Sequence, residues 1–407
     1  MRDRMRILIA NRNFDRKGVV CGGEMSVRAL GRSLRDMGHE IGILSVDDHT
    51  ATRLHEPTGF MDFRVKTRNL YLDGDHPAAQ RLLFHINDRF RHLMDDDYVR
   101  VLETFRPDVV NTNTLASLSL GVWRAAFRLG IPVVHTANDY YPVCTRSGMI
   151  RKDGTNCANV CRLCRIFARN RSLPLSRKVS HAIYVSEYMK SVIHDREGLF
   201  PDCAQSVVSR SYAPPDGLPA RKGLLEPDRL NIGFIARLSP EKGLESLLGT
   251  LREFFPRSWR LHVAGNGNPD YVAHLKALAR DLPVEFLGQQ KPEDLYARVD
   301  VTVANALWNE PSGRTVMESI LNGAVPIVTN RGGLFETAGN GAWGFCFEPE
   351  RPRDLIQILN HIRQTPSVLD EKRLETPKAR QLFDPTRIAE RTLSAFEDAI
   401  QNNRSRV

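Results

Sequence analysis

The sequence predicts an α/β protein with two doubly wound, Rossmann-like domains that face each other across a cleft. Its 407 residues are enough for two domains of ordinary size. Short apolar runs alternate with helix-length amphipathic stretches along the whole chain, which is typical of parallel sheets covered on both faces. Pro214, Pro215 and Gly217 interrupt this alternation near the middle and favour a domain boundary there.

Six apolar runs in the first half are predicted strands of one parallel sheet. They lie at residues 6–10, 40–45, 108–111, 132–135, 182–185 and 206–209. Residues 23–37, after the first run, are predicted to form a helix because Ala29, Leu30 and Leu34 fall on one helical face. We expect a first domain over residues 1–212.

Five apolar runs in the second half are predicted strands of a second parallel sheet. They lie at residues 230–235, 260–264, 284–287, 301–304 and 325–328. Residues 313–322, after the fourth of these runs, have an amphipathic helical pattern, and so does the stretch after Phe383. We expect a second domain over residues 213–385 and a C-terminal helix over residues 386–407.

Charge is unevenly distributed along the chain. The net charge is +9, and the excess lies in residues 1–215, where 32 Lys and Arg accompany 23 Asp and Glu. A basic surface of this kind attracts anionic lipid, nucleic acid or a phosphorylated substrate, and a solvated, solubilising surface is the alternative. The richest stretch, residues 162–178, mixes Arg with Leu163, Ile166 and Phe167, which suits a membrane face.

The location of the protein follows from its apolar segments. No stretch approaches the roughly 20 apolar residues of a membrane-spanning helix. The apolar run after the basic N-terminus, residues 7–10, is too short for a signal peptide. We therefore expect a cytoplasmic protein, and the basic stretch leaves open a peripheral position on the inner face of the cytoplasmic membrane.

Glycines precede the first predicted helix. Doubly wound sheets bind ligands beyond the carboxyl ends of their strands. Gly22 and Gly23 stand at such a position, where backbone N–H groups at a helix start can approach a phosphate. A simple turn is the alternative.

Two cations and two carboxylates follow strands of the second half. Arg237 and Lys242 lie after residues 230–235 and could stabilise the charge that develops on a departing diphosphate, although solvated surface charges are the alternative. Glu310 and Glu318 stand eight positions apart and could accept hydrogen bonds from the vicinal hydroxyls of a sugar or ribose.

Further backbone amides in this half could hold a phosphate. Gly313 and Arg314 begin the predicted helix between the two carboxylates, and helix starts bind anions. Gly332 and Gly333 form another glycine turn after a predicted strand. Each of these motifs is common alone, but their combination in this order is not.

Four of the seven cysteines cluster in an insert over residues 144–164. They are Cys144, Cys157, Cys161 and Cys164. Thiolates at this spacing could close a structural, tetrahedral Zn²⁺ site, since a cytosolic location disfavours disulfides. An iron–sulfur cluster and a set of incidental or buried thiols are the alternatives.

Seven short motifs together resemble glycosyltransferase family 4, whose members are retaining, nucleotide-sugar-dependent enzymes of the GT-B fold. The motifs are Gly22-Gly23-Glu24, Gly38-His39-Glu40, His135, Arg237 with Lys242-Gly243, Glu310-x7-Glu318, Gly323-x2-Pro326 and Gly332-Gly333-x2-Glu336. They span nearly the whole chain in the family's order. Ala236 departs from the pattern, because the family often has Gly before the Arg.

The resemblance implies a role for each matched residue. Gly23, Arg237 and Lys242 would lie by the donor diphosphate, Glu310 would bind the sugar hydroxyls, Glu318 would bind the ribose, and His135 would approach the transferred sugar from the first domain. A histidine that is merely hydrogen-bonded structure is the alternative for His135. The family also implies that the C-terminal helix crosses back to the first domain and that transfer needs no divalent metal.

The function implied is a hexosyltransferase-type enzyme that moves a sugar from a UDP- or GDP-sugar to a glycan or lipid-linked saccharide in surface polysaccharide biosynthesis. A nucleotide-sugar epimerase or hydrolase of the same fold is one alternative. A zinc-bearing nucleic-acid-binding protein is another, but the chain offers only scattered basic residues for that role, and we expect no nucleic-acid partner.

Overall fold

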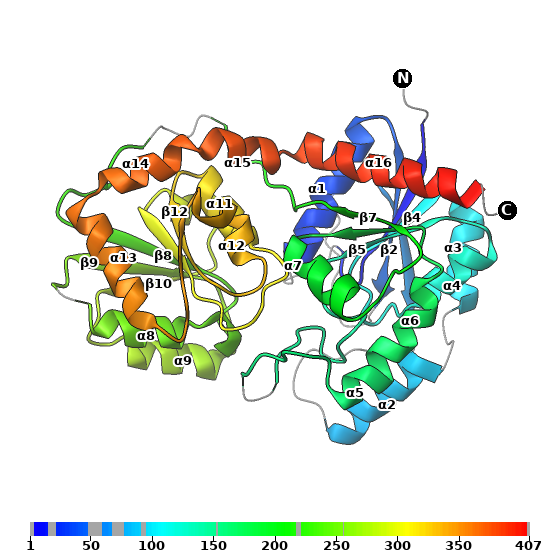
Figure 1. Cartoon of the computed structure of the whole chain (residues 1–407), viewed down its shortest axis with the longest axis horizontal. Coiled ribbons are helices and arrows are strands. Elements are labelled where there is room, and N and C mark those ends of the chain that lie inside the picture. Colours follow the sequence, from blue (N-terminus) through cyan, green and yellow to red (C-terminus); the bar gives the residue numbers. More distant parts are fainter. Residues whose placement is uncertain are drawn as a thin grey trace. The chain divides into compact units, whose positions relative to one another are not determined.

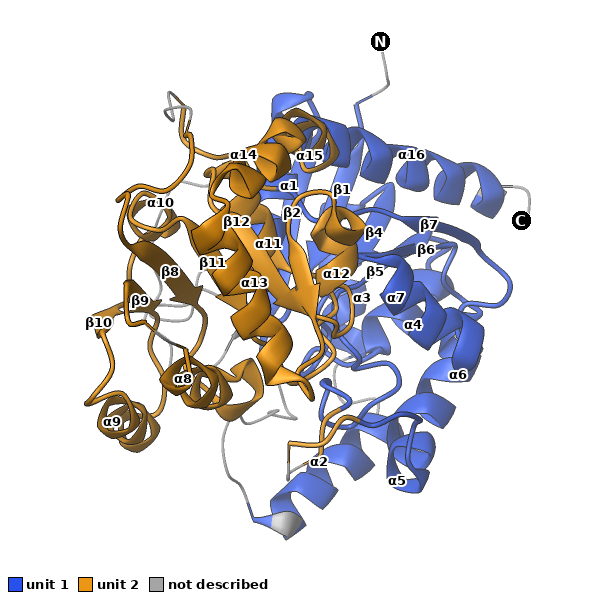
Figure 2. Cartoon of the chain, turned by 60° about the vertical axis from the view of Figure 1, so that its left-hand side comes forward, with its two compact units in different colours: residues 1–149, 157–211, 385–407 blue, residues 150–156, 212–384 orange. Residues whose placement is uncertain are grey.

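The computed structural model describes residues 4–14, 22–47, 59–66, 77–90, 95–151, 154–216, 221–254 and 256–404. The chain forms two compact units, coloured separately in Figure 2. Unit 1 comprises Met1–Met149, Cys157–Ser211 and Pro385–Val407, whereas unit 2 comprises Ile150–Asn156 and Tyr212–Asp384. The chain therefore passes from one unit to the other four times, and neither unit is a single continuous stretch.

The described residues of unit 1 form a seven-stranded sheet in which every pairing is parallel. The strand order is β3-β2-β1-β4-β5-β6-β7. The strands are β1 (Arg6–Ala10), β2 (Glu40–Asp47), β3 (Met61–Lys66), β4 (Val109–Thr112), β5 (Val133–Ala137), β6 (His181–Tyr184) and β7 (Ala204–Val207).

Helices from both ends of the chain pack on this sheet. Ile7 and Ile9 of β1 share a core with Val27 of α1 and with Leu393 and Phe396 of α16. Figure 1 shows α16 beside α1. The described helices of unit 1 are α1 (Gly22–Asp36), α2 (Ala78–Phe90), α3 (Asp95–Phe105), α4 (Gly121–Arg128), α5 (Arg162–Cys164), η1 (Arg165–Arg169), α6 (Asn170–Ser176), α7 (Glu187–Lys190), η2 (Ser191–Arg196) and α16 (Pro385–Arg404).

The described residues of unit 2 form a six-stranded sheet, again with parallel pairings only. The strand order is β10-β9-β8-β11-β12-β13. The strands are β8 (Leu230–Ile235), β9 (Trp259–Ala264), β10 (Val284–Gly288), β11 (Val301–Ala304), β12 (Val325–Thr329) and β13 (Phe345–Phe347). Nearly all residues of β8 and β12 are buried, so both strands are mostly apolar.

Helices of unit 2 complete its core. Leu247 and Leu251 of α8 pack with Ile232 and Leu261 of the sheet and with Leu359 of α13. The described helices are η3 (Pro240–Lys242), α8 (Leu244–Arg252), α9 (Pro269–Leu278), α10 (Pro292–Tyr296), α11 (Arg314–Leu321), α12 (Leu334–Thr337), η4 (Gly339–Gly341), α13 (Pro352–Gln364), α14 (Ser367–Leu374) and α15 (Thr376–Leu382).

The strand order reverses once in each sheet, between β1 and β4 in unit 1 and between β8 and β11 in unit 2. The loops that leave the carboxyl ends of these neighbouring strands diverge to opposite faces of the sheet. Ligands of doubly wound folds bind at such a switch point. Each unit therefore has one edge where a ligand is expected.

The structure confirms the predicted fold class and all eleven predicted strands, with shifts of a few residues at their ends. It adds two strands that the sequence analysis missed, β3 and β13, each at the edge of its sheet. Among the described residues, no helix is both long enough and apolar enough to cross a membrane.

Candidate functional site

The loops after β8 and β11 bring Lys242 and Glu310 together, although 68 positions separate them. Their side chains form an ion pair and are half-buried. Trp308 contacts both side chains: its Nε1 donates to Glu310 Oε1 at 3.1 Å, and its ring centroid is 5.2 Å from Lys242 Nζ. The pair thus offers an ammonium group to an anion and a carboxylate to hydroxyl groups at the switch point of unit 2.

Arg237, the other predicted cation, stands apart from this pair. Its side chain is 72% exposed and donates from Nη2 to Glu241 Oε1 at 2.8 Å. Burial would raise the pKa of Glu241, but hydrogen bonds and the positive charge of Arg237 outweigh it and lower that pKa. Arg237 is thus a solvent-exposed cation on the loop that leads to Lys242.

Glu318 lies on α11 and is buried in a polar cluster. Arg314 Nε donates to Glu318 Oε1 at 2.7 Å, and Tyr296 Oη donates to Oε2 at 3.3 Å. Burial raises the pKa of Glu318, whereas the nearby Arg314 opposes that rise. Glu318 and Arg314 are therefore partners of each other, four residues apart along the helix.

Gly313 precedes α11 and its amide already has a partner. The Gly313 N–H donates to Thr337 Oγ1 at 3.3 Å. Because Thr337 Oγ1 itself donates to the Gly333 carbonyl at 2.8 Å, this hydroxyl links the two glycine motifs. A phosphate at the start of α11 would take the place of Thr337 on the Gly313 amide.

Gly332 and Gly333 hold the backbone of Glu310. Glu310 and Gly332 form a parallel bridge, and Gly333 N donates to Glu310 O at 2.7 Å. Gly332 has φ of +63°, and a Cβ added there would lie 2.0 Å from Glu310 O. Only glycine fits this close approach, so the glycine turn and the carboxylate position are coupled.

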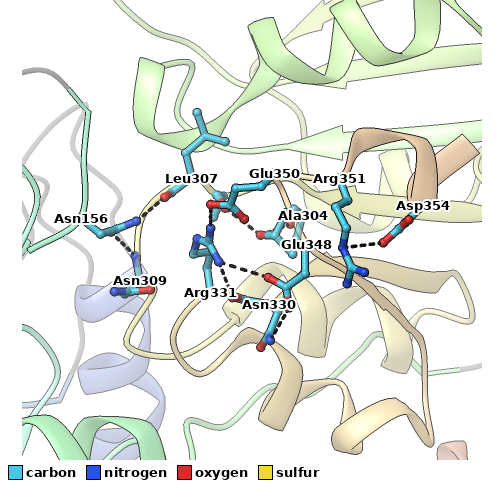
Figure 3. Close-up of polar contacts among 12 residues, drawn as sticks. Asn156, Ala304, Leu307, Asn309, Asn330, Arg331, Glu348, Glu350, Arg351 and Asp354 are labelled. Carbon is cyan, nitrogen blue, oxygen red and sulfur yellow. Dashed lines mark hydrogen bonds and ion pairs between the residues drawn. The ribbon is translucent and has the colours of Figure 1, made fainter. Parts of the chain in front are cut away.

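Acidic side chains fasten the same turn from its other side. Arg331 pairs with Glu348 at 3.5 Å and with Glu350, and Asn330 Nδ2 donates to Glu348 Oε1 at 2.8 Å. Figure 3 shows these side chains meeting between the loop after β12 and the chain beyond β13. The turn that carries Gly332 is thus braced at both ends.

Replacing Gly332 by alanine is expected to lower the free energy of unfolding by more than about 2 kcal/mol, because the new Cβ strains φ and collides with Glu310 O. Urea unfolding measures the loss. The matched control is Gly249→Ala in α8, where an added Cβ meets nothing within 4 Å and stability should rise. Equal stabilities of the two variants would contradict the close approach.

In unit 1, Gly22 and Gly23 begin α1 as predicted. A Cβ added to Gly23 would lie 3.7 Å from Thr114 Oγ1, which places the helix start beside the loop after β4. Residues 15–21, which lead into the helix, are outside the described residues. The two glycines are therefore at the switch point of unit 1.

His135 is buried within β5 and is only 2% exposed. Its Nδ1 lies 3.0 Å from Thr112 Oγ1, and its ring stacks on Phe200 with centroids 5.4 Å apart. Trp123 contacts both rings edge-on, with its centroid 5.0 Å from that of His135 and 5.7 Å from that of Phe200. Burial lowers the pKa of His135 to about 3, so the imidazole is neutral at pH 7. This packed position does not support the catalytic role expected from the resemblance.

Because the imidazole of His135 is buried in its neutral form, it binds a proton more readily in the unfolded protein than in the folded one. We expect the free energy of unfolding to fall as the pH drops below the ordinary histidine pKa of about 6.5. Between pH 7 and 5.5 the loss should amount to about 1 kcal/mol for this side chain. His135→Gln, measured by urea unfolding at both pH values, should show a shallower slope, and an unchanged slope would contradict the assignment.

The sequence analysis missed a polar cluster just beyond β5. Asn138 Nδ2 donates to Asn113 Oδ1 at 2.8 Å, and Arg210 Nη2 donates to Asn138 O at 3.3 Å. Burial raises the pKa of the neighbouring Asp139 to about 6. The signal was available, since Asn138 and Asp139 are the first residues after a strand that ends at Ala137.

The four clustered cysteines do not form the predicted zinc site. Cys144 is buried, and its Sγ accepts from the N–H groups of Arg146 and Met149, each at 3.4 Å. A hydrogen bond with Cys164 lowers the pKa of the Cys144 thiol to about 7. Among the described residues, which include all four cysteines, no three His, Cys, Asp or Glu side chains converge on a metal position. The prediction of structural zinc is therefore not supported.

Two family models match the chain, one on each side of the predicted boundary. Glycosyltransferase Family 4 matches residues 20–209, and Glycosyl transferases group 1 matches residues 220–377. The chain is also 27% identical over 322 residues to an uncharacterised 42.6 kDa protein in the cps region of Klebsiella pneumoniae, which covers 77% of this chain and 83% of that protein.

Solved structures share the fold. Sucrose-phosphate synthase from Thermosynechococcus elongatus superposes with a TM-score of 0.71 at 16% identity, over 97% of this chain and 98% of that one. Alr3699/HepE from Anabaena, solved in complex with UDP, superposes with a TM-score of 0.70 at 19% identity, over 96% and 99%. The two parallel sheets with their switch points are those of GT-B enzymes. The chain therefore belongs to the family 4, group 1 type glycosyltransferases and has the GT-B fold.

Proposed function

We propose that the protein is a retaining hexosyltransferase that moves a sugar from a UDP- or GDP-sugar to a glycan or lipid-linked saccharide in surface polysaccharide biosynthesis. The observation that carries the proposal is the Lys242–Glu310 pair with Trp308 at the switch point of unit 2. The similarity to a protein of the cps region and to an enzyme solved with UDP supports the pathway and the donor.

Each donor group meets a side chain of matching chemistry in this proposal. Lys242 and the exposed Arg237 bind the diphosphate and stabilise the charge that develops as it leaves. Glu310 accepts hydrogen bonds from sugar hydroxyls, which fixes the reacting carbon toward the acceptor. Both roles need only positioning and electrostatics, so transfer is expected to proceed without a divalent metal.

The remaining donor contacts come from α11 and the glycine turns. Glu318 binds the ribose, for which its carboxylate has spare lone pairs beside those that Arg314 and Tyr296 use. The amides of Gly313 and Arg314 at the start of α11, and those of Gly332 and Gly333, approach the diphosphate. In unit 1, the amides of Gly22 and Gly23 at the start of α1 can approach a phosphate group.

A panel of UDP- and GDP-sugars, incubated with and without bacterial lipid extract, tests the function. We expect transfer from at least one donor, with the anomeric configuration of the sugar kept in the product as seen by NMR. Hydrolysis or epimerisation without an acceptor would favour the alternative enzymes of this fold. Neither turnover nor binding of any nucleoside diphosphate would refute the proposal.

The proposal includes a peripheral position on an anionic membrane, where lipid-linked acceptors reside. An apolar surface on α2 is exposed, and α2 packs against η1 through the rings of His85 and Phe167, 6.2 Å apart. Cations of the adjacent α5 and η1, Arg162 and Arg165, are exposed as well. The exposed apolar side chains are Leu82, Leu83, Ile86, Phe90, Leu163 and Ile166. Exposed apolar side chains with neighbouring Arg residues suit an anionic lipid interface.

The double variant Leu83→Glu, Leu163→Glu is expected to lose most of its sedimentation with phosphatidylglycerol vesicles, because it places two anions at the lipid interface. Wild-type protein should sediment with these vesicles, and less with phosphatidylcholine vesicles or at high salt. Leu374→Glu, at a 77% exposed site in unit 2, is the control and should sediment like the wild type. Wild-type protein that ignores anionic vesicles would contradict the membrane position.

A further inference from the structure

The cysteine-rich insert contains a short hairpin that belongs to unit 2. Residues 150–156 lie in that unit, whereas the chain before and after them lies in unit 1. Ile150 and Asn156 form an antiparallel bridge, and Cys157 N donates to Met149 O at 2.8 Å to close the base. Arg151 N donates to Thr155 O at 2.8 Å inside the hairpin. Asn156 is the last residue of the insert that lies in unit 2.

The Asn156 side chain makes two hydrogen bonds to one loop of unit 2. Its Nδ2 donates to Leu307 O at 2.7 Å, and its Oδ1 accepts from Asn309 N at 3.0 Å, as Figure 3 shows. Turning the amide over would put like groups opposite each other at both contacts, so this orientation is the one the partners require. The side-chain amide of Asn156 thus satisfies two backbone groups of residues 307–309, as a neighbouring strand would do in a sheet.

Trp308 lies between the two backbone groups that Asn156 holds. Its indole donates to Glu310 Oε1, and Lys242 Nζ lies over its ring. The same loop is held from the other side, because Leu307 N donates to Glu241 O at 2.9 Å, one residue before Lys242. Fixing the peptides on both sides of Trp308 fixes the ring, and the ring orients the carboxylate and the ammonium group.

We propose that Asn156 is a positioning residue for the donor site, and that the role of the cysteine-rich insert is to carry it there. This inference rests on the proposed function of Lys242 and Glu310. The loop after β11 has no regular secondary structure between Ala304 and Arg314, so its polar backbone groups depend on side-chain partners such as Asn156. Donor binding therefore depends on a residue that precedes the whole of the second domain in sequence.

Three variants test the inference by kinetics. Asn156→Ala removes both hydrogen bonds, and Asn156→Asp keeps the size and the acceptor but loses the donor. Both should raise the apparent KM for the nucleotide sugar about tenfold and lower kcat less, because the diphosphate and sugar contacts are loosened. Asn231→Ala is the matched control: its amide also donates once and accepts once, but near the amino end of β8, away from the switch point. It should lower Tm without changing KM.

A second readout is independent of activity. The chain has four Trp residues, so a spectrum of ¹⁵N-indole-labelled protein should show four side-chain signals, and Trp308→Phe assigns one of them. Asn156→Ala should shift or broaden that signal and leave the others in place, whereas Asn231→Ala should leave it unchanged. An unmoved Trp308 signal, or an unchanged KM in an active enzyme, would overturn the inference. If the Trp308 signal shifts in Asn156→Ala, but the wild-type protein neither binds nor turns over any nucleotide sugar, the result would contradict the proposed function alone.

Discussion

Replacing Glu310 by glutamine is expected to lower the rate of sugar transfer by about 100-fold while the protein stays folded. The substitution keeps the size of the side chain but removes its charge. Lys242 then loses its ion-pair partner, and one oxygen acceptor beside the Trp308 indole is replaced by an amide that donates. Two vicinal sugar hydroxyls that would donate to the two carboxylate oxygens are then left with one acceptor oxygen.

Steady-state kinetics with the best donor of the panel measures this effect, and circular dichroism with thermal unfolding checks the fold. Glu375→Gln is the matched control, because Glu375 forms an exposed ion pair with Lys378 in unit 2. Since an exposed ion pair contributes about 0–1 kcal/mol to stability, the control should stay folded. It should therefore transfer sugar at the wild-type rate. Wild-type activity in Glu310→Gln would remove Glu310 from the site.

Replacing Arg171 by methionine is expected to lower the free energy of unfolding by about 3–5 kcal/mol. Arg171 is buried in unit 1 and pairs with Asp88 of α2, whose side chain is only 3% exposed. It also donates from Nη1 to Tyr141 Oη at 3.0 Å, and its guanidinium lies 4.3 Å from the Tyr141 ring centroid. Its removal leaves a buried carboxylate with Tyr141 as its remaining neutral donor.

The double variant Arg171→Met, Asp88→Leu distinguishes the loss of the ion pair from the cost of leaving one buried charge without its partner. Because both charges are then gone, we expect it to recover part of the loss, so that the effects of the two single changes are not additive. Arg177→Met is the control, since Arg177 pairs with Asp202 on the surface and should cost less than about 1 kcal/mol. Urea unfolding of the wild type, the two single variants, the double variant and Arg177→Met checks the expectation, which equal losses for Arg171→Met and Arg177→Met would contradict.

Strand positions were readable from the sequence wherever both faces of a strand are buried. β1 and β12 are continuous apolar runs for that reason. β3 and β13 were not predicted, because neither is a buried apolar run of sufficient length. Met61 at the start of β3 is 45% exposed, and β13 has only three residues. Apolar runs therefore predicted the centre of each sheet and one of its edge strands, β7 or β10, and missed the other edge.

The candidate site was predicted in part for a comparable reason. Chain order after β8 and β11 identified Lys242 and Glu310, because neighbouring parallel strands present their following loops at one edge. Spacing could also have paired Arg314 with Glu318, which stand four residues apart on one helix. Asn156 could not be predicted from the sequence. Its contacts are with a loop about 150 positions further along the chain, and no local sequence pattern indicates them.

The end of the strand that contains His135 was predicted two residues too early. The resemblance implied that His135 approaches the transferred sugar, and the predicted strand ended at this residue, but β5 continues to Ala137. Inside a strand of a doubly covered sheet, a side chain faces the core. The residues at the actual end, Asn138 and Asp139, are the polar ones.

The helix α16 has a consequence for how the protein is made. Its Leu393 and Phe396 close the same core as Ile7 and Ile9 of the first strand. On the ribosome, this core stays incomplete until α16 (Pro385–Arg404) has emerged, whereas the described part of unit 2 precedes α16 in the chain and can collapse earlier. Synthesis from the N-terminus usually lets the first-made domain fold first. Here the early strands of unit 1 stay exposed to chaperones until α16, which follows unit 2 in the chain, has been made.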